Sequence, residues 1–148
     1  MELGGEFYLD LNTLSEKEHS VASCLASERP LFFDSGRSAL RFAAQGLRPG
    51  TVLLPEYICD SVRSAFPAHA LRFYRLTPSL EIDLSDLAEK LDESISAVFL
   101  MHYFGAVQPR PVLEYLSAVR QRFGFTVIED TTHSIFSRPY LQILRVAV

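Results

Sequence analysis

The stretch FTVIEDTTHSIFS, at residues 125–137, decides the fold. Its first four residues are apolar or β-branched and follow Gly124, a pattern that predicts a short buried strand. Glu129, Asp130 and His133 come directly after this strand. Ligands of open α/β sheets bind in the crevice outside the carboxyl ends of the strands, so we expect these side chains to mark the chemical end of the molecule. The structural alternative is that Asp130 only caps a following helix.

Strand-like and helix-like segments alternate along the rest of the chain. Short apolar runs predict three further strands, at residues 51–54, 70–75 and 95–101. Helical spacing of apolar residues predicts helices at residues 15–29, 36–47, 56–66, 84–91 and 109–122. Strands that alternate with helices through short connections imply an α/β fold, a three-layer α/β/α sandwich with a largely parallel sheet.

Composition restricts the class of ligand. The 148 residues suit one domain, and the formal net charge is −4 with no basic face, which argues against nucleic acid and anionic membrane surfaces as partners. A small-molecule substrate is the better expectation. Cys24 and Cys59 are isolated, which fits reduced thiols and a cytoplasmic protein. No apolar run approaches the length of a membrane span.

A second candidate binding element lies at residues 34–40, with the sequence DSGRSAL. A turn of small residues that opens a helix leaves backbone N–H groups at the positive end of the helix dipole, where they can hold a phosphate. Gly36, Arg37 and Ser38 would form this cradle. The alternative is a capped helix that binds no anion.

Four elements together resemble the DegT/DnrJ/StrS family of aminotransferases, which use pyridoxal phosphate to act on nucleotide-linked sugars. They are IEDTTHS at residues 128–134, the turn at residues 34–40, the helix entry at residues 81–91, and HYFG at residues 102–105. The resemblance implies that Asp130 pairs with the protonated pyridine nitrogen, which makes the ring an electron sink. It also implies that His133 contacts the phenolic oxygen of the cofactor, where the family often has Gln, and that Gly36, Arg37 and Ser38 hold its phosphate.

The resemblance assigns further residues around the same cofactor. The position of the aromatic side chain that stacks on the pyridine ring falls at Cys59, which leaves Tyr57 as a substitute. His102 ends a strand on the same edge as Asp130 and is also expected at the cofactor. Overall, the resemblance implies a fold type I transferase that takes a nucleotide-linked keto sugar and an amino donor, and that forms a homodimer with active sites at the interface.

The resemblance divides the chain into three parts. Residues 1–30 would be an N-terminal arm and helix, residues 31–137 an incomplete cofactor-binding large domain, and residues 138–148 a tail without a clear match. In the family, a Lys beyond the Asp motif forms a Schiff base with the cofactor. Lys17 and Lys90 are the two lysines of this sequence, and neither falls at that place. We therefore expect a truncated chain that is catalytically incomplete alone.

Two other classes of function remain open from the sequence. A metal-dependent hydrolase would use His102, Glu129, Asp130 and His133, although no ligand spacing of the His-x-x-x-His kind supports it. A non-catalytic nucleotide-binding, cofactor-binding or interaction domain is the other. Its Rossmann form would need Gly-x-Gly-x-x-Gly after the first strand, which residues 34–40 do not supply.

Overall fold

The structure, a computed structural model, describes residues 31–134 and the backbone of residues 144–146. The described elements all belong to one compact unit, Phe33–Val148. The predicted arm and helix at residues 1–30 lie outside the described residues. So does the predicted tail at residues 138–148, apart from three residues that form a strand.

Five strands form one sheet whose neighbours all pair in parallel, in the order β2-β1-β3-β4-β5. The strands are β1 (Thr51–Pro55), β2 (Ala70–Tyr74), β3 (Ile95–Met101), β4 (Thr126–Asp130) and β5 (Leu144–Val146). The helices are α2 (Gly36–Gln45), α3 (Asp60–Arg63), α4 (Leu84–Lys90) and α5 (Arg110–Phe123), with a short 3₁₀ turn, η3 (Tyr103–Gly105). The predicted α/β class and parallel sheet are confirmed.

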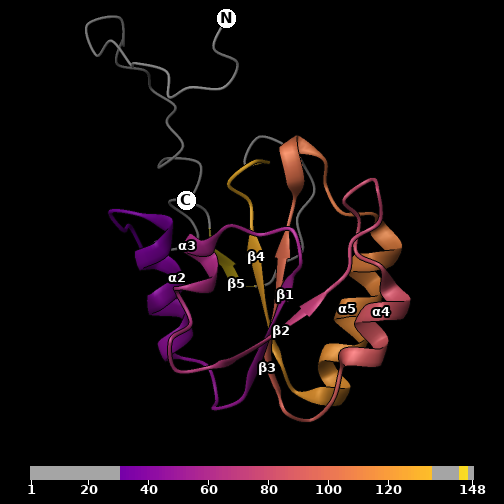
Figure 1. The fold of residues 1–148 in the computed structure, drawn as a ribbon, viewed down its shortest axis with the longest axis horizontal. Coiled ribbons are helices and arrows are strands. Elements are labelled where there is room, and N and C mark those ends of the chain that lie inside the picture. The colour runs from indigo at the N-terminus through magenta and orange to yellow at the C-terminus, as the bar shows by residue number, and fades with distance from the viewer. Residues whose placement is uncertain (1–30, 135–143, 147–148) are drawn as a thin grey trace, which may run out of the picture. The chain divides into compact units, whose positions relative to one another are not determined.

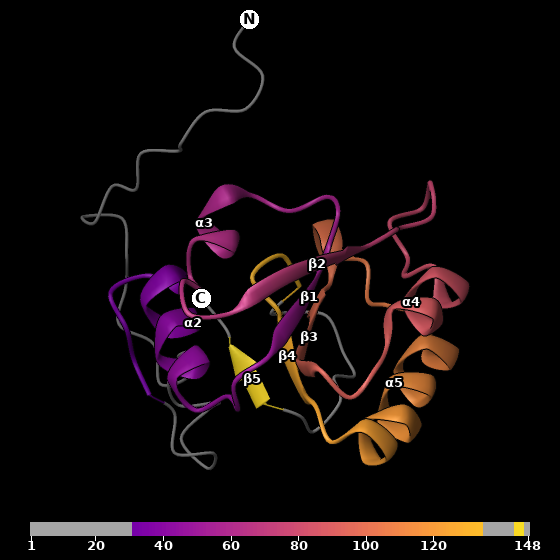
Figure 2. The ribbon, with the colours of Figure 1, turned by 60° about the horizontal axis from the view of Figure 1, so that its bottom comes forward.

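Helices cover both faces of the sheet, which gives the three layers (Figures 1 and 2). Side chains alternate along each strand, so Val52 and Leu54 join the cluster with α2 and α3, whereas Leu53 joins the cluster with α4 and α5. Strands that are covered on both faces are apolar at nearly every position. This explains why β1 and β3 are continuous apolar runs in the sequence.

Two elements differ from the sequence predictions. The helix expected to begin at residue 56 is only the four-residue α3, because the chain bends at residues 56–57 and Cys59, just before the helix, has an extended backbone. The backbone N–H of Glu56 donates to the carbonyl of Tyr74 at 2.9 Å, which holds this segment beside β2. The strand β5, which pairs with β4, was not predicted, since three residues carry too little pattern to identify a strand.

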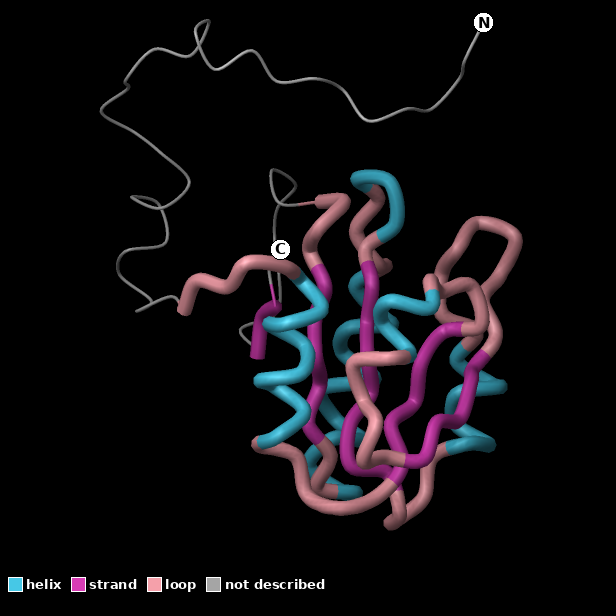
Figure 3. The backbone as a smooth tube through the Cα atoms, turned by 60° about the vertical axis from the view of Figure 1, so that its left-hand side comes forward, coloured by secondary structure: helices cyan, strands magenta, loops and turns pink. Residues whose placement is uncertain are grey.

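The chain reverses its direction of travel across the sheet between β1 and β3. From β1 it passes through α3 to the edge strand β2, and then through α4 to β3 on the other side of β1. Pairing between β1 and β3 extends to Leu53 and Val98, and both strands continue beyond it. Such a switch point, at the carboxyl ends of parallel strands, is where α/β proteins bind ligands. Figure 3 shows the segments that follow β3 and β4 at the same end of the sheet.

The start of β1 gives a stability prediction. Gly50 has φ +153°, and a Cβ atom there would lie 2.4 Å from the carbonyl oxygen of Ser94, which itself accepts the N–H of Thr51. We expect Gly50→Ala to lower the free energy of unfolding by more than about 1 kcal/mol, measured by urea denaturation. Gly46→Ala is the matched control. Gly46 has φ −86° and its nearest contact would be 3.6 Å, so we expect a neutral or slightly stabilising effect. Equal stability of the two variants would contradict this account of the backbone.

Candidate active site

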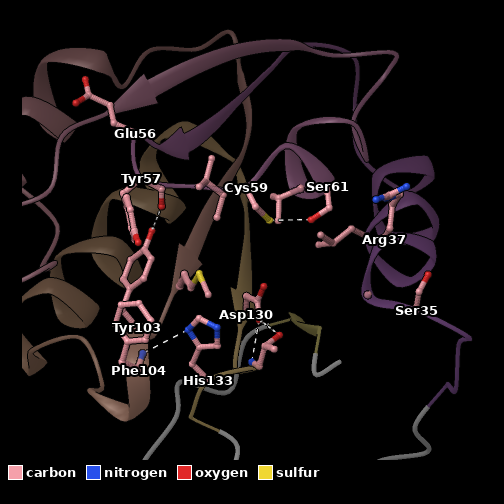
Figure 4. A pocket seen from close by; sticks show the side chains of 16 residues that line it. Ser35, Arg37, Glu56, Tyr57, Cys59, Ser61, Tyr103, Phe104, Asp130 and His133 are labelled. Atoms are coloured by element: carbon pink, nitrogen blue, oxygen red, sulfur yellow. Dashed lines mark hydrogen bonds between the residues drawn. The ribbon is translucent and has the colours of Figure 1, made fainter. Parts of the chain in front are cut away.

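A pocket of about 910 Å³ opens at the carboxyl ends of β1, β3 and β4. Four segments line it: the start of α2, the residues that follow β1, the end of β3 with η3, and the residues that follow β4. In Figure 4, Ser35 and Arg37 lie on one side of the pocket, the rings of Tyr57, Tyr103 and Phe104 lie on the other, and Asp130 lies between them. The polar lining residues are Ser35, Arg37, Glu56, Tyr57, Cys59, Ser61, Tyr103, Asp130, Thr132 and His133.

Asp130 stands at the last position of β4 and is buried, with 6% of its surface exposed. Its Oδ1 accepts hydrogen bonds from the backbone N–H of Thr132 at 2.9 Å and from the Thr132 hydroxyl at 2.5 Å. These bonds fix the carboxylate as the chain turns after the strand. The alternative expected for Asp130 was the cap of a following helix, whereas residues 131–134 form a turn that Asp130 holds while it lines the pocket.

The start of α2 lies across the pocket from the aromatic side chains. Ser35 caps the helix, and its hydroxyl oxygen accepts the backbone N–H of Ser38 at 3.3 Å. Gly36 and Arg37 line the pocket, and their role as a phosphate cradle stays a prediction. Ser38 does not line it. Its hydroxyl instead faces Ser35 at 3.0 Å and bonds the carboxyl of Asp34, which lowers the pKa of that carboxyl.

Four rings follow one another along the opposite wall. The ring centroids of Tyr57 and Tyr103 are 5.8 Å apart, those of Tyr103 and Phe104 are 6.3 Å apart, and those of Phe104 and His133 are 5.2 Å apart. The hydroxyl of Tyr103 donates to the backbone carbonyl of Tyr57 at 2.6 Å. Burial, reinforced by the negative charge of Asp130, raises the pKa of the Tyr103 phenol, which keeps this donor protonated. We call these four residues the aromatic wall.

Phe104 has an unusual backbone conformation within the aromatic wall. Its φ of 52° and ψ of 33° lie in the left-handed region, which costs a bulky side chain on the order of 1 kcal/mol or more. The backbone N–H of Phe104 donates to Nδ1 of His133 at 3.4 Å, and the two rings stack with an interplanar angle of 18°. Phe104 nevertheless keeps 69% of its residue surface exposed.

Cys59 also lines the pocket, at the position expected for the stacking aromatic side chain, and its thiol is exposed. Partial burial acts to raise the pKa of this thiol. Hydrogen bonds from the Ser61 hydroxyl, 2.7 Å from Sγ, and from the backbone N–H of Val62 outweigh this effect, so the pKa is lowered overall.

His102 is fully buried and does not line the pocket. Its backbone N–H bonds the carbonyl of Asp130, but strand alternation turns its imidazole toward the opposite face, where Nε2 lies 2.8 Å from Oε1 of Glu129. Its Nδ1 accepts the backbone N–H of Gln108 at 3.0 Å. A nitrogen that accepts an N–H carries no proton, so His102 is neutral and donates from Nε2 to Glu129. The predicted contact between His102 and a cofactor is therefore not supported by the position of His102.

The same alternation separates the residues considered for a metal site. Asp130 and His133 line the pocket, whereas Glu129 and His102 form a buried pair away from it. Within residues 31–134, no group of three or more His, Cys, Asp or Glu side chains is arranged to hold a metal ion. The four residues therefore do not form one ligand set.

Several lining residues were not assigned from the sequence. Glu56, Ser61, Met101 and Thr132 all line the pocket, and so does Phe104, which the sequence placed in the HYFG motif without a role. Each lies at the carboxyl end of a strand or in the segment that follows it. The rule that ligands bind at that edge would have included them.

Neither lysine can be placed in the pocket. Lys90 lies at the end of α4, on the opposite face of the sheet, and its Nζ bonds Oδ2 of Asp86 at 2.7 Å. Lys17 lies outside the described residues. No lysine is present among the described lining residues.

The sequence matches no protein-family profile and no curated protein. The fold, by contrast, is shared with solved aminotransferases. Alanine aminotransferase from Pyrococcus furiosus aligns with a TM-score of 0.60 and 19% identity over 72% of this chain and 30% of that enzyme. Aspartate aminotransferase from Thermotoga maritima aligns with a TM-score of 0.60 and 20% identity over 67% of this chain and 29% of that enzyme.

A third structure, 3-amino-5-hydroxybenzoic acid synthase, aligns with a TM-score of 0.58 and 18% identity, over 67% of this chain and 27% of that protein. The chain thus spans less than a third of the length of these proteins. At identities of this size, the likeness establishes an α/β fold of the aminotransferase kind.

None of the described helices is long and apolar enough to cross a membrane.

The buried pair gives a second stability prediction. Glu129→Leu removes the acceptor of the His102 Nε2–H inside the protein, so we expect the free energy of unfolding to fall by about 3 kcal/mol. The double variant His102→Leu/Glu129→Leu should lose less than the sum of the two single variants, measured by chemical denaturation. Glu114→Leu is the control, because its ion pair with Arg110 is exposed and is worth about 0.5 kcal/mol or less. Equal losses in Glu129→Leu and Glu114→Leu would refute the role of the pair.

Proposed function

We propose that the pocket binds pyridoxal phosphate and that the chain is the cofactor-binding part of an aminotransferase. The observation that carries this proposal is the position of Asp130. A fixed carboxylate at the carboxyl end of β4 faces the same pocket as the start of α2, in a fold shared with aminotransferases. The DegT/DnrJ/StrS motifs in the sequence support the same assignment.

The residues present fit the chemical groups of this cofactor. Its phosphate suits the N-terminal end of α2, where the first N–H groups of a helix have no partner within the helix and Arg37 adds positive charge. Its ring nitrogen suits Asp130, and its phenolic oxygen suits a donor such as His133. When Phe104 donates to Nδ1 of His133, the neutral imidazole carries its proton on Nε2, which can serve as that donor.

The bound cofactor would supply an electron sink for a carbanion at the substrate carbon. The residues of this chain would hold the cofactor and polarise its ring. Asp130 would direct its carboxylate toward the ring nitrogen, and Thr132 orients that carboxylate through two hydrogen bonds. Burial of Asp130 strengthens its interaction with a positive partner, because the surroundings are less polar than water.

The family resemblance extends the proposal to the substrates and the assembly. We propose a nucleotide-linked keto sugar as acceptor, a separate amino donor, and a homodimer. The pocket volume of about 910 Å³ is near the upper end of the range for small-molecule sites, which is consistent with a cofactor and a substrate together.

A second candidate is a domain that binds the cofactor or a nucleotide without catalysis. The absence of lysine from the described lining favours it, since transamination needs an amine base near the reacting carbon. Both candidates share the same binding residues, and they differ in whether amino-group transfer occurs.

Binding of the cofactor tests the shared part of the proposal. In equilibrium dialysis with pyridoxal phosphate, we expect Asp130→Asn to weaken binding at least about tenfold, since a charge-assisted hydrogen bond is worth about 1.5–3 kcal/mol. The variant should remain folded, because Asn can still accept from Thr132. Bound cofactor should also slow alkylation of Cys59 by iodoacetamide in a Cys24→Ser background. The lowered pKa of Cys59 favours its thiolate, which is the form that iodoacetamide alkylates.

The control for this experiment is Asp60→Asn, which makes the same charge change at an exposed site beside the pocket. It should bind the cofactor as the unaltered chain does. Unchanged binding in Asp130→Asn, or cofactor binding without protection of Cys59, would count against the proposed site.

The lysines give a separate prediction. We expect the 148-residue chain to hold the cofactor without a covalent bond to lysine, because Lys90 is tied to Asp86 on the far face of the sheet. Borohydride reduction after incubation with pyridoxal phosphate, followed by peptide mapping, should label neither Lys17 nor Lys90 stoichiometrically. The denatured chain serves as the positive control. Full labelling of one lysine, together with amino transfer to a keto sugar nucleotide, would show that the chain is catalytically complete.

A further inference from the structure

The left-handed backbone conformation of Phe104 does not bury its side chain. A bulky residue in the left-handed region is strained, and an interior position would offset such strain by removing the ring from water. Phe104 instead leaves 69% of its surface exposed while lining the pocket. Strained residues that gain little from packing are concentrated at ligand-binding sites.

The backbone around Phe104 presents the ring in a fixed orientation. Gly105 follows with φ +87°, so two successive residues have positive φ and turn the chain sharply after β3. His133, from the segment that follows β4, supports the ring through a near-parallel stack at 5.2 Å and accepts the Phe104 N–H. Figure 4 shows these two residues together at one side of the pocket. The ring is therefore held from one side and open on its remaining surface.

We infer that Phe104, supported by His133, is a stacking platform for the base of a nucleotide. A supported aromatic ring with an exposed face extends its stack most favourably with another flat ring, and every nucleobase offers a π face. Asp130 and the start of α2 are assigned to the cofactor, which leaves this end of the aromatic wall for a second ligand. The inference rests on the proposed function, since it places the nucleotide part of the proposed substrate at Phe104.

Calorimetric titration of the 148-residue chain tests the platform. The probes are UMP and AMP, with ribose 5-phosphate as the matched ligand that lacks a base. We expect both nucleotides to bind more tightly than ribose 5-phosphate. Phe104→Asn should reduce this advantage at least about fivefold, because stacking contributes about 1–3 kcal/mol per base. Phe104→Tyr keeps the ring and should keep the advantage.

Stability separates a platform from a structural residue. Asn tolerates the left-handed region better than Phe, so Phe104→Asn should unfold at the same temperature as the unaltered chain or higher. A structural role predicts a lower temperature. Phe104→Leu provides a second variant that keeps apolar bulk without a π face, and it should also lose the nucleotide advantage. Phe42→Ala, at an exposed ring on α2 outside the pocket lining, is the matched control and should keep it.

The outcomes distinguish this inference from the proposed function. The platform would be overturned if the nucleotides bind no more tightly than ribose 5-phosphate. It would also be overturned if their advantage survives in both Phe104→Asn and Phe104→Leu. Either result would count even if pyridoxal phosphate binds through Asp130. Loss of pyridoxal phosphate binding alone in these variants would also overturn it. Nucleotide binding that depends on Phe104 in a chain that does not bind pyridoxal phosphate would support the platform and refute the proposed aminotransferase site.

Discussion

The alternation of side chains along β4 is the constraint on which the site depends. Because successive residues of a strand point to opposite faces, Glu129 and Asp130 are adjacent in sequence but lie in different surroundings. Asp130 follows the direction of Ile128, toward α2 and α3, and lines the pocket. Glu129 follows Val127, toward α4 and α5, and pairs with the neutral imidazole of His102. The carboxylate of Asp130 can therefore contact a ligand, while the carboxylate of Glu129 bonds His102 and so links the ends of β3 and β4.

The order of the strands creates the pocket beside Asp130. The chain leaves β1 toward one edge of the sheet and returns on the other side of it, so the segments that follow β1 and β3 separate above the sheet. A hydrogen bond from Tyr103 to the carbonyl of Tyr57 spans this separation. The aromatic wall is thus fixed to both segments. The polar start of α2 lies opposite, and a ligand between them would meet different chemistry on its two sides (Figure 4).

Stability and binding are divided between the two faces at this end of the sheet. The face that carries α4 and α5 holds a buried network, in which His102 pairs with Glu129 and accepts the backbone N–H of Gln108. The side chain of Gln108 in turn bonds the backbone at Leu80, Ile82 and Met101. The pocket face holds the exposed thiol of Cys59 and the exposed side chain of Phe104, whose backbone is strained. These features contribute little to folding. This division is expected where a rigid scaffold presents a binding site.

The sequence by itself determined the fold class and the location of the site. Continuous apolar runs such as residues 95–101 require a sheet covered on both faces, and the carboxylate that follows β4 marks its ligand-binding edge. Only the tertiary structure decided which strand-end residues share the pocket. His102 matched a motif yet lies on the far face, Ser38 bonds Ser35 and Asp34, and Phe104 joins His133 across 29 residues of sequence. These outcomes depend on strand register and on hydrogen bonds between distant segments, which a local pattern of residues does not contain.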